Sequence, residues 1–257
     1  MQSNHTIDDV RQYWNTYIND VEVINEPLGS PAFFDALERY RYEKIDFLKS
    51  YVDFGRYAGK SVLEVGCGPG IDLMQFARAG AKVFARDLTP NAVALARANL
   101  AREGLSGDIQ EGNAETLGFP DDTFDVYYSN GVLHHTLDTE RAISEAHRVL
   151  KPGGEAIVML YNRRSWLYLA AKLSGTPIEH AEKDAPIVRC YTTRECRKMF
   201  GKFRDVQLHV DRFPKRTLKF DNVMAKLNNN VLVPFFELLP QKVKRPFGWH
   251  IMIRARK

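Results

Sequence analysis

Residues 61–71 read Ser-Val-Leu-Glu-Val-Gly-Cys-Gly-Pro-Gly-Ile. The apolar run at 62–65 predicts a buried strand, and the three closely spaced glycines that follow predict a tight turn. Apolar residues then recur at helical spacing from Leu73 to Ala79, which indicates a helix. A strand, a glycine turn and a helix form the opening unit of a nucleotide-binding α/β fold, because the helix N-terminus offers unpaired N–H groups to a ligand.

A second apolar strand, residues 81–86, ends at Asp87, where such a fold places the acid that binds a ribose. The glycine spacing is Gly-x-Gly-x-Gly, whereas NAD-binding proteins use Gly-x-Gly-x-x-Gly. Residues 64–70 (Glu-Val-Gly-Cys-Gly-Pro-Gly) and 86–90 (Arg-Asp-Leu-Thr-Pro) resemble the first two motifs of the class I S-adenosylmethionine-dependent methyltransferases. The resemblance covers about residues 30–160 and is greatest to the small-molecule group typified by ubiquinone and menaquinone C-methyltransferases.

Composition excludes several other classes of protein. The chain has 257 residues with 36 basic and 32 acidic side chains, and this small excess forms no basic stripe of the kind that binds nucleic acid. The 3 cysteines are scattered, so they predict neither a disulfide framework nor a zinc site, and we expect a cytoplasmic protein with reduced thiols. No apolar stretch approaches the roughly 20 residues needed to cross a bilayer.

The pattern of elements predicts one methyltransferase domain over residues 1–257. We expect a Rossmann-like, seven-stranded, mostly parallel sheet with an antiparallel last strand and helices on both faces. Residues 1–58 are predicted to form an N-terminal helical cap, and residues 59–161 the cofactor-binding core. Residues 162–257 are predicted to hold acceptor-side insertions, including a C-terminal lid, and the last two strands.

The resemblance implies S-adenosylmethionine as cofactor and S-adenosylhomocysteine as product. By this resemblance, Asp87 is the acid that binds the ribose. Glu64 orders the glycine loop beside the amine of the cofactor's methionine part. Asn113 stands where the family usually has an Asp that accepts from the adenine amine, and its side-chain oxygen offers the same acceptor without charge. The implied cofactor-binding residues are Glu64, Gly66, Cys67, Gly68, Gly70, Asp87, Leu88, Asn113, Ala114, Glu115 and Asn130.

Candidate catalytic residues follow the strand predicted at 124–129. His134 and His135 are adjacent, so in a helical turn only one of them readily faces the methyl group, and we favour His135. Histidine is the side chain best suited to remove a proton near neutral pH. Tyr161 ends the strand predicted at 155–161 and joins them as a candidate. No metal is expected, because no His, Asp or Glu set has ligand spacing in the sequence.

Candidate acceptor-binding residues lie outside the core. Three of them are aromatic residues of two helices predicted near the N-terminus. For each of the three, packing in the protein core is the alternative interpretation. The apolar stretch 231–239 is a candidate lid, with core packing or an interface as the alternatives. The full set of candidates is Trp14, Tyr17, Tyr42, Asn162, Arg163, Phe235 and Phe236.

These patterns predict that a monomer or homodimer transfers a methyl group to a small-molecule acceptor. The sequence does not decide whether the methylated atom is O, N or C. An NAD-dependent reductase is disfavoured by the glycine spacing. A cofactor-binding pseudoenzyme or regulatory partner stays open because of Asn113. A nucleic-acid methyltransferase is a further alternative, against which stand the absence of an Asn-Pro-Pro-aromatic motif and of a basic stripe.

Overall fold

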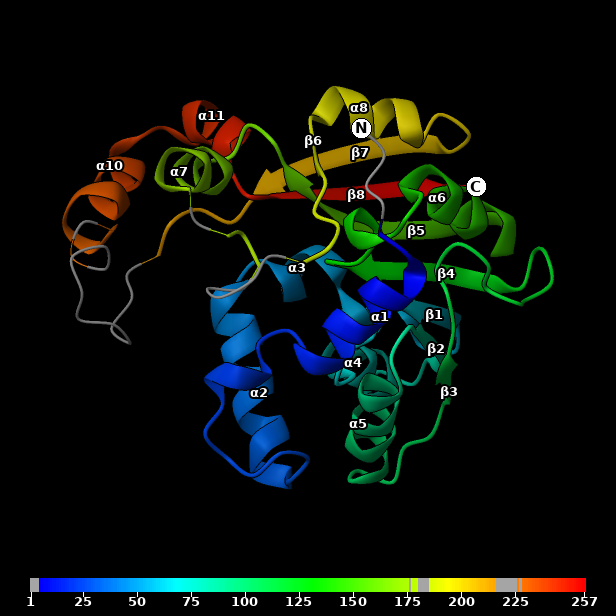
Figure 1. Cartoon of the computed structure of the whole chain (residues 1–257). Helices are drawn as coiled ribbons and strands as arrows, with labels where there is room; N and C mark the ends of the chain where they lie inside the picture. The colour runs from blue at the N-terminus through cyan, green and yellow to red at the C-terminus, as the bar shows by residue number, and fades with distance from the viewer. Residues whose placement is uncertain (1–4, 176, 180–184, 216–225, 227) are drawn as a thin grey trace.

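One eight-stranded sheet forms the centre of the computed structural model, which describes residues 5–175, 177–179, 185–215, 226 and 228–257 (Figure 1). Its strand order is β3-β2-β1-β4-β5-β8-β7, and the two-residue β6 pairs with β5. Only β8 runs antiparallel to its neighbours. The strands are β1 (Ser61–Val65), β2 (Lys82–Asp87), β3 (Asp108–Glu111), β4 (Phe124–Asn130), β5 (Leu150–Asn162), β6 (Cys190–Tyr191), β7 (Arg204–Asp211) and β8 (His250–Arg256). The predicted Rossmann-like sheet with an antiparallel last strand is confirmed, and β6 is an addition to it.

Helices lie on both faces of the sheet. They are α1 (Ile7–Thr16), α2 (Pro31–Lys44), α3 (Leu48–Val52), α4 (Ile71–Arg78), α5 (Pro90–Ala101), α6 (Thr139–Val149), α7 (Trp166–Ser174), α8 (Thr193–Met199), α10 (Val233–Leu238) and α11 (Gln241–Lys244). Within the predicted N-terminal helical cap, residues 31–52 form two separate helices. The chain turns between α2 and α3, and the turn lets Ile45 and Leu48 both enter the core.

Alternation along the strands divides the core between the two faces. Val62 and Tyr128 pack with residues of α3, α4 and α5, whereas Leu63 and Tyr127 pack with residues of α6 and α8. Successive side chains of a strand point to opposite faces, so a strand covered on both sides is apolar throughout. This explains why Val62, Leu63 and Val65 of β1 are all apolar although they point to both faces, and why the strand is readily recognised in the sequence.

The N-terminal helix α1 is attached to the segment that follows β2. Arg11 Nε donates to the Leu88 carbonyl at 3.3 Å, and Asn91 bonds to Asn15 through both its backbone and its side chain. Thr6 caps the start of the helix in a capping box with Asp9. Helix α1 therefore lies over the carboxyl edge of the parallel strands, where α/β folds bind ligands.

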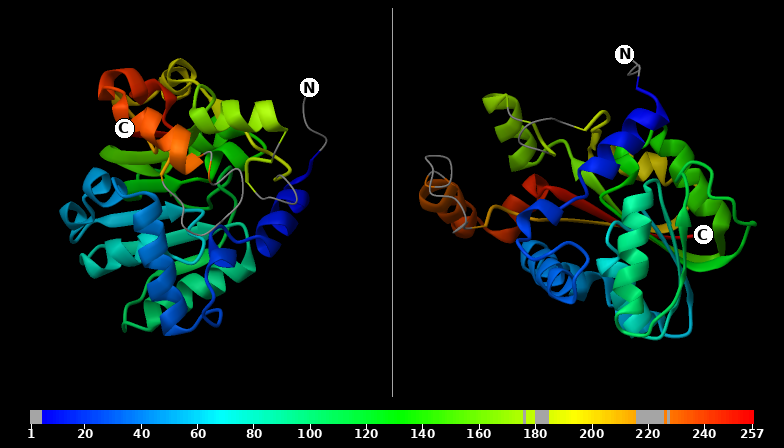
Figure 2. Two further views of the ribbon diagram at one scale, coloured as in Figure 1. Left: turned by 90° about the vertical axis from the view of Figure 1, so that its left-hand side faces the viewer. Right: turned by 60° about the horizontal axis from the view of Figure 1, so that its bottom comes forward.

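The C-terminal insertion lies elsewhere. Helices α10 and α11 stand together beyond the ends of β7 and β8, well away from α1 in all three views (Figures 1 and 2). Part of the predicted insertion, residues 216–225 and 227, falls outside the described residues. Within the part of the chain that the structure describes, none of the helices combines the length and apolar character needed to cross a bilayer.

Candidate functional site

The glycine turn after β1 is held in a conformation that only glycine fits. Gly66 has φ +72°, and a Cβ there would lie 2.2 Å from Val132 Cγ2. Gly70 has φ +73° and precedes α4, with Ala96 Cβ 3.0 Å from the place a Cβ would take. The backbone can therefore fold tightly under a ligand while the N-terminus of α4 faces the same space.

Asp87, at the end of β2, is tied to this turn. Its Oδ2 accepts from the Gly68 backbone N–H at 3.0 Å, and its Oδ1 accepts from the N–H and hydroxyl of Thr89 at 3.0 and 2.9 Å. Burial raises the pKa of the Asp87 carboxyl, and these hydrogen bonds act against that rise. The side chain is thus fixed in place and still has lone pairs for a ligand hydroxyl.

Glu64 is the buried acid of the site that lacks a full set of partners. It is 4% exposed, and within the described part of the chain its Oε2 has no hydrogen-bond partner. Burial and then the neighbouring charge of Asp72 raise the pKa of Glu64 well above its usual range. A buried acceptor without a partner is costly, and a positively charged ligand group would relieve that cost.

Asp72, in the first turn of α4, was not anticipated from the sequence. The Arg41 guanidinium donates two hydrogen bonds to the Asp72 carboxylate. The hydroxyls of Tyr42 and Tyr128 also donate to this carboxylate, at 2.8 and 2.6 Å. Burial would raise the pKa of Asp72, but Arg41 and the two phenols hold it below its usual value. Tyr42, predicted to contact the acceptor, therefore has its hydroxyl committed to Asp72, and it lines neither cavity described below.

A cavity of about 1140 Å³ opens between the glycine turn and α1. Of the eleven predicted cofactor residues, nine line it; they are Glu64, Gly66, Cys67, Gly68, Asp87, Leu88, Asn113, Ala114 and Asn130. Gly70 lies behind the turn. Glu115 is also outside, since its Oε1 accepts from the backbone N–H groups of Leu137 and Asp138 at 2.8 and 3.2 Å. Glu115 thus organises the loop before α6, a role that its neighbours in the sequence do not reveal.

Asn113 lines the cavity, but its side-chain oxygen is already in use. Asn113 Oδ1 accepts from the Glu115 backbone N–H at 2.9 Å, which closes a local turn. An amide oxygen has two lone pairs, so one stays open to a ligand donor. An Asp at this position would make the same turn.

A second cavity of about 940 Å³ adjoins the first. The two share lining residues from α1 and its following loop, α2 and the end of β4; these are Trp14, Ile18, Asn19, Asp20, Arg41, Asn130 and Gly131. Tyr17 and Tyr161 line the second cavity, as does Trp249, whose ring stacks on Tyr161 with centroids 4.1 Å apart. The predicted positions of Trp14 and Tyr17 beside a ligand cavity are thus found in the structure.

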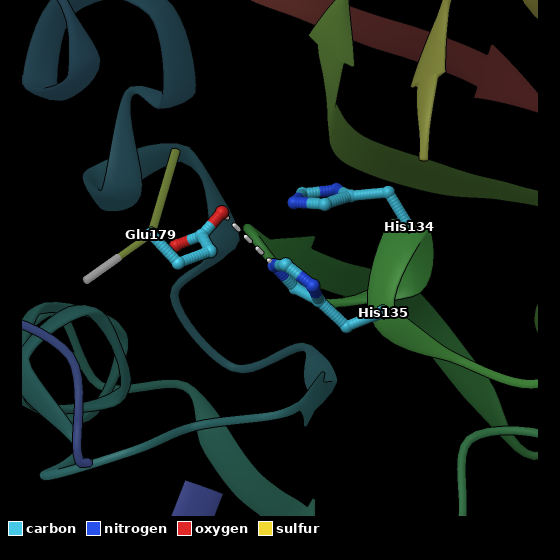
Figure 3. Close-up of side chains that lie close together, drawn as sticks. All are labelled: His134, His135 and Glu179. Atoms are coloured by element: carbon cyan, nitrogen blue, oxygen red, sulfur yellow. Dashed lines mark ion pairs between the residues drawn. The ribbon is translucent and has the colours of Figure 1, made fainter. Parts of the chain in front are cut away.

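His134, His135 and Glu179 converge beside the two cavities (Figure 3). His135 Nδ1 lies 2.6 Å from the Ile187 carbonyl, and Nε2 lies 3.4 Å from Glu179 Oε1. Burial would raise the pKa of Glu179, but the charge of His135 and hydrogen bonds from His135 and Tyr161 lower it. His135 lines the first cavity and Glu179 the second, so this pair joins them.

His134 takes a different environment from its neighbour. Its ring is fully buried, lies 3.8 Å from the Tyr161 ring centroid, and lines neither cavity. Burial lowers its pKa far below the usual value, so it is neutral. One nitrogen of each histidine and one Glu179 oxygen lie within 4.8 Å of one another, a set that could hold a metal ion. Sequence spacing missed this set because Glu179 belongs to the insertion after β5.

Four other predicted acceptor residues lie away from both cavities. Asn162 is buried, and its Nδ2 donates to the carbonyls of Pro246 and Gly248. Arg163 forms a two-point ion pair with Glu195. Phe236 is buried near Phe213, and Phe235 is 57% exposed on α10. The structure therefore does not bring these four predicted acceptor residues to either cavity, because each is used locally or lies on an element that packs elsewhere.

Residues 63–158 match the family described as "Methyltransferase domain". A ubiquinone/menaquinone biosynthesis C-methyltransferase of Marinomonas sp. is 33% identical over 114 residues, covering 42% of this chain and 45% of the relative. A ubiquinone biosynthesis O-methyltransferase of Pseudomonas paraeruginosa is 36% identical over 120 residues, covering 46% and 51%. The chain spans about half the length of these curated relatives.

Solved structures of similar fold cover more of the chain. An S-adenosylmethionine-dependent methyltransferase from Archaeoglobus fulgidus has a TM-score of 0.59 at 15% identity, covering 88% of this chain and 99% of that one. The [4+2]-cyclase SpnF has a TM-score of 0.61 at 19% identity, covering 98% and 97%. At these identities the likeness concerns the fold alone.

The matched core defines a class of protein. Residues 63–158 match a methyltransferase domain, and S-adenosylmethionine is the cofactor of that class. Over this core the chain is similar to relatives named for ubiquinone and menaquinone biosynthesis.

Proposed function

We propose that the protein transfers the methyl group of S-adenosylmethionine to a small-molecule acceptor and releases S-adenosylhomocysteine. The observation that carries this proposal is the pair of adjoining cavities, which meet at Asn130 and Gly131 after β4. The first cavity has the cofactor motifs along its wall, and the second offers room for another molecule next to it. The whole of residues 1–257 is proposed to act as one domain, with α1 covering the cofactor.

The first cavity suits a positively charged nucleoside. Four carboxyl groups line it, those of Asp20, Glu64, Asp72 and Asp87. Lys44 pairs with Asp20 and Arg41 with Asp72. We propose that Asp87 accepts from the ribose hydroxyls. The unpartnered Oε2 of Glu64 is proposed to accept from the cofactor's amine side, which would restore its ionised form. These acids supply the field that attracts a sulfonium and an ammonium group.

The second cavity suits an acceptor with a flat apolar part. Tyr13, Trp14, Tyr17, Tyr161 and Trp249 all contribute to its wall. Aromatic side chains give large contact areas at low entropic cost and stack on planar ligands. Positioning is the main contribution a methyltransferase makes, because the sulfonium already activates the methyl group.

The acceptor's proton is proposed to leave through His135 and Glu179. In this step a lone pair of the acceptor atom forms the bond to the methyl carbon, and the C–S bond breaks with its electrons passing to sulfur. The proton of the acceptor atom passes to His135 Nε2, whose charge Glu179 then balances at 3.4 Å. Ile187 holds the ring through Nδ1, so that Nε2 keeps this orientation. Tyr161, which hydrogen-bonds to Glu179, is proposed to lie beside the acceptor and to act with this pair.

Calorimetry followed by a product assay tests this proposal. We expect S-adenosylmethionine to bind and NADH not to bind, and we expect S-adenosylhomocysteine release when small phenols, amines and enolisable ketones are supplied. Addition of EDTA should leave the rate unchanged, because attack on a sulfonium needs no Lewis acid. Cofactor binding without product release from any acceptor class would favour a cofactor-binding protein that is not a transferase, and NADH binding would favour a reductase.

A further inference from the structure

Arg212, the residue after β7, has an unusual backbone conformation. Its φ is +67°, in the left-handed region that favours glycine. The backbone is fixed there because the Arg212 carbonyl accepts from the N–H of Trp249 at 3.0 Å and from Trp166 Nε1 at 3.2 Å. A strained residue that its surroundings hold in place is a sign that its side chain has a use.

The guanidinium of Arg212 lines the second cavity beside His250. Arg212 Nη1 lies 2.8 Å from His250 Nε2. Because a guanidinium can only donate, Nε2 must accept, and the ring proton of His250 sits on Nδ1. Burial and the charge of Arg212 lower the pKa of His250 far below its usual value, in agreement with a neutral ring.

His250 Nδ1 is therefore a hydrogen-bond donor in need of an acceptor. The side chain is 1% exposed and lines the second cavity, and Nδ1 has no hydrogen-bond partner among the residues that the structure describes. A buried donor left without a partner is costly. An acceptor atom supplied by a ligand in the cavity would remove that cost.

Arg212 also differs from the other cations of the cavity. Arg41 is paired with Asp72, and Lys44 lies 2.5 Å from Asp20. Among the carboxylates of the same wall, Glu179 is paired with His135. Arg212 forms no ion pair with a carboxylate anywhere in the described part of the chain, so its positive charge is the one in this cavity left for a ligand.

We infer that Arg212 and His250 form a carboxylate-binding subsite for the acceptor. A planar guanidinium offers parallel N–H groups that match the two oxygens of a carboxylate, and the neutral imidazole adds a third donor. Both residues line the second cavity and not the first. A bound acceptor would be anchored there by its acid and present its reactive atom toward Asn130 and His135. The role as acceptor subsite rests on the proposed methyl transfer, whereas the binding of a carboxylate does not.

The test compares benzoate with benzamide, which have nearly the same shape and differ in charge. S-adenosylhomocysteine is first added to saturation so that the first cavity is filled. Calorimetry and the fluorescence of Trp14 and Trp249, which line the cavity, then report binding of each probe. We expect benzoate to bind at least about tenfold more tightly than benzamide, because a charge-assisted pair is lost with the amide.

Arg212→Gly is the decisive variant, because glycine accepts the left-handed backbone without strain. It should abolish the preference for benzoate while the melting temperature stays equal or rises. Arg245→Ala is the matched control: this exposed arginine lies outside both cavities, and its loss should leave the preference intact. His250→Phe, which keeps a ring in place, should reduce the preference several-fold.

Each other result overturns the inference. Equal affinity for the two probes, no binding of either, or a preference that survives Arg212→Gly would show that no carboxylate subsite exists. Loss of S-adenosylhomocysteine affinity in Arg212→Gly with unchanged benzoate binding would assign Arg212 to the cofactor. Failure of S-adenosylhomocysteine to bind the unaltered protein would instead count against the proposed function, so the two failures are distinguishable.

Discussion

The two cavities of this protein are built in different ways. Much of the first cavity comes from short segments at the ends of successive parallel strands, namely residues 64–69, 86–89, 112–114, 130–132 and 135–136. Apart from residues 13–23, on and after α1, the second cavity takes mostly separate residues from α2, from β5, from the insertion after β5 and from the start of β8. A wall made of contiguous turns leaves a motif in the sequence, whereas a wall assembled from isolated side chains leaves none. The following predictions test this contrast, beginning with the largest expected effect.

The junction of the cavities should control the rate of reaction. We expect His135→Ala to lower turnover by roughly 10²–10⁴-fold, the usual contribution of a positioned general base. Affinity for S-adenosylmethionine should stay the same by calorimetry. Glu179→Gln keeps the shape of its side chain and should give a smaller loss. His5→Ala, an exposed histidine, serves as the control. Turnover near that of the unaltered protein in His135→Ala would reduce this histidine to a structural role.

The buried ion pair beside the cofactor cavity should matter most for stability. Asp72→Asn leaves the Arg41 guanidinium buried without a counter-charge, at a cost of about 3–5 kcal/mol. For a chain of this size we expect the melting temperature to fall by roughly 6–20 °C. Asp121→Asn breaks a pair with Arg148 in which Asp121 is 71% exposed, and should cost under about 1 kcal/mol. Similar losses from the two variants would contradict the importance assigned to burial.

The acid after β2 should affect binding of the cofactor alone. Asp87→Ala is expected to weaken S-adenosylmethionine binding by about 1.5–3 kcal/mol, the loss of a hydrogen bond to a charged group. Asn113→Asp should leave binding equal or tighter, because an Asp oxygen can still accept from the Glu115 N–H. Calorimetry measures both. Unchanged affinity in Asp87→Ala would remove the ribose assignment, and lost affinity in Asn113→Asp would refute the proposed adenine contact.

The smallest effects compare the acceptor wall proposed from the cavities with the one predicted from the sequence. Trp14→Ala should raise the acceptor's Michaelis constant by roughly 2–10-fold, the range of a lost aromatic contact. Phe235→Ser should leave it within about twofold, because Phe235 is exposed on α10 and lines neither cavity. A larger change from Phe235→Ser than from Trp14→Ala would mean that α10 closes over the acceptor during turnover.

Prediction succeeded where function depends on local backbone. The strand before Gly66, the strand that ends at Asp87 and the strand predicted at 124–129 were all placed correctly, because apolar runs and glycines act within a few positions of themselves. The same reasoning did not anticipate the hydrogen-bond partners of Tyr42 and Glu115. Both were read as ligand contacts, and both bond instead to groups far along the chain, Asp72 and the backbone after His135.

By itself, the sequence determined the class of fold and the cofactor, since Gly66 and its neighbours demand one backbone path whatever surrounds them. Only the tertiary structure brought Glu179 to His135 and Arg212 to His250. Such pairs come from segments joined by no local rule: Arg212 meets His250 because β7 pairs with β8, and Glu179 reaches His135 from the insertion after β5. The chemistry of these pairs depends on how deeply their side chains are buried and on which polar atoms lack hydrogen-bond partners. Both are properties of the folded chain that the spacing of residues in the sequence does not reveal.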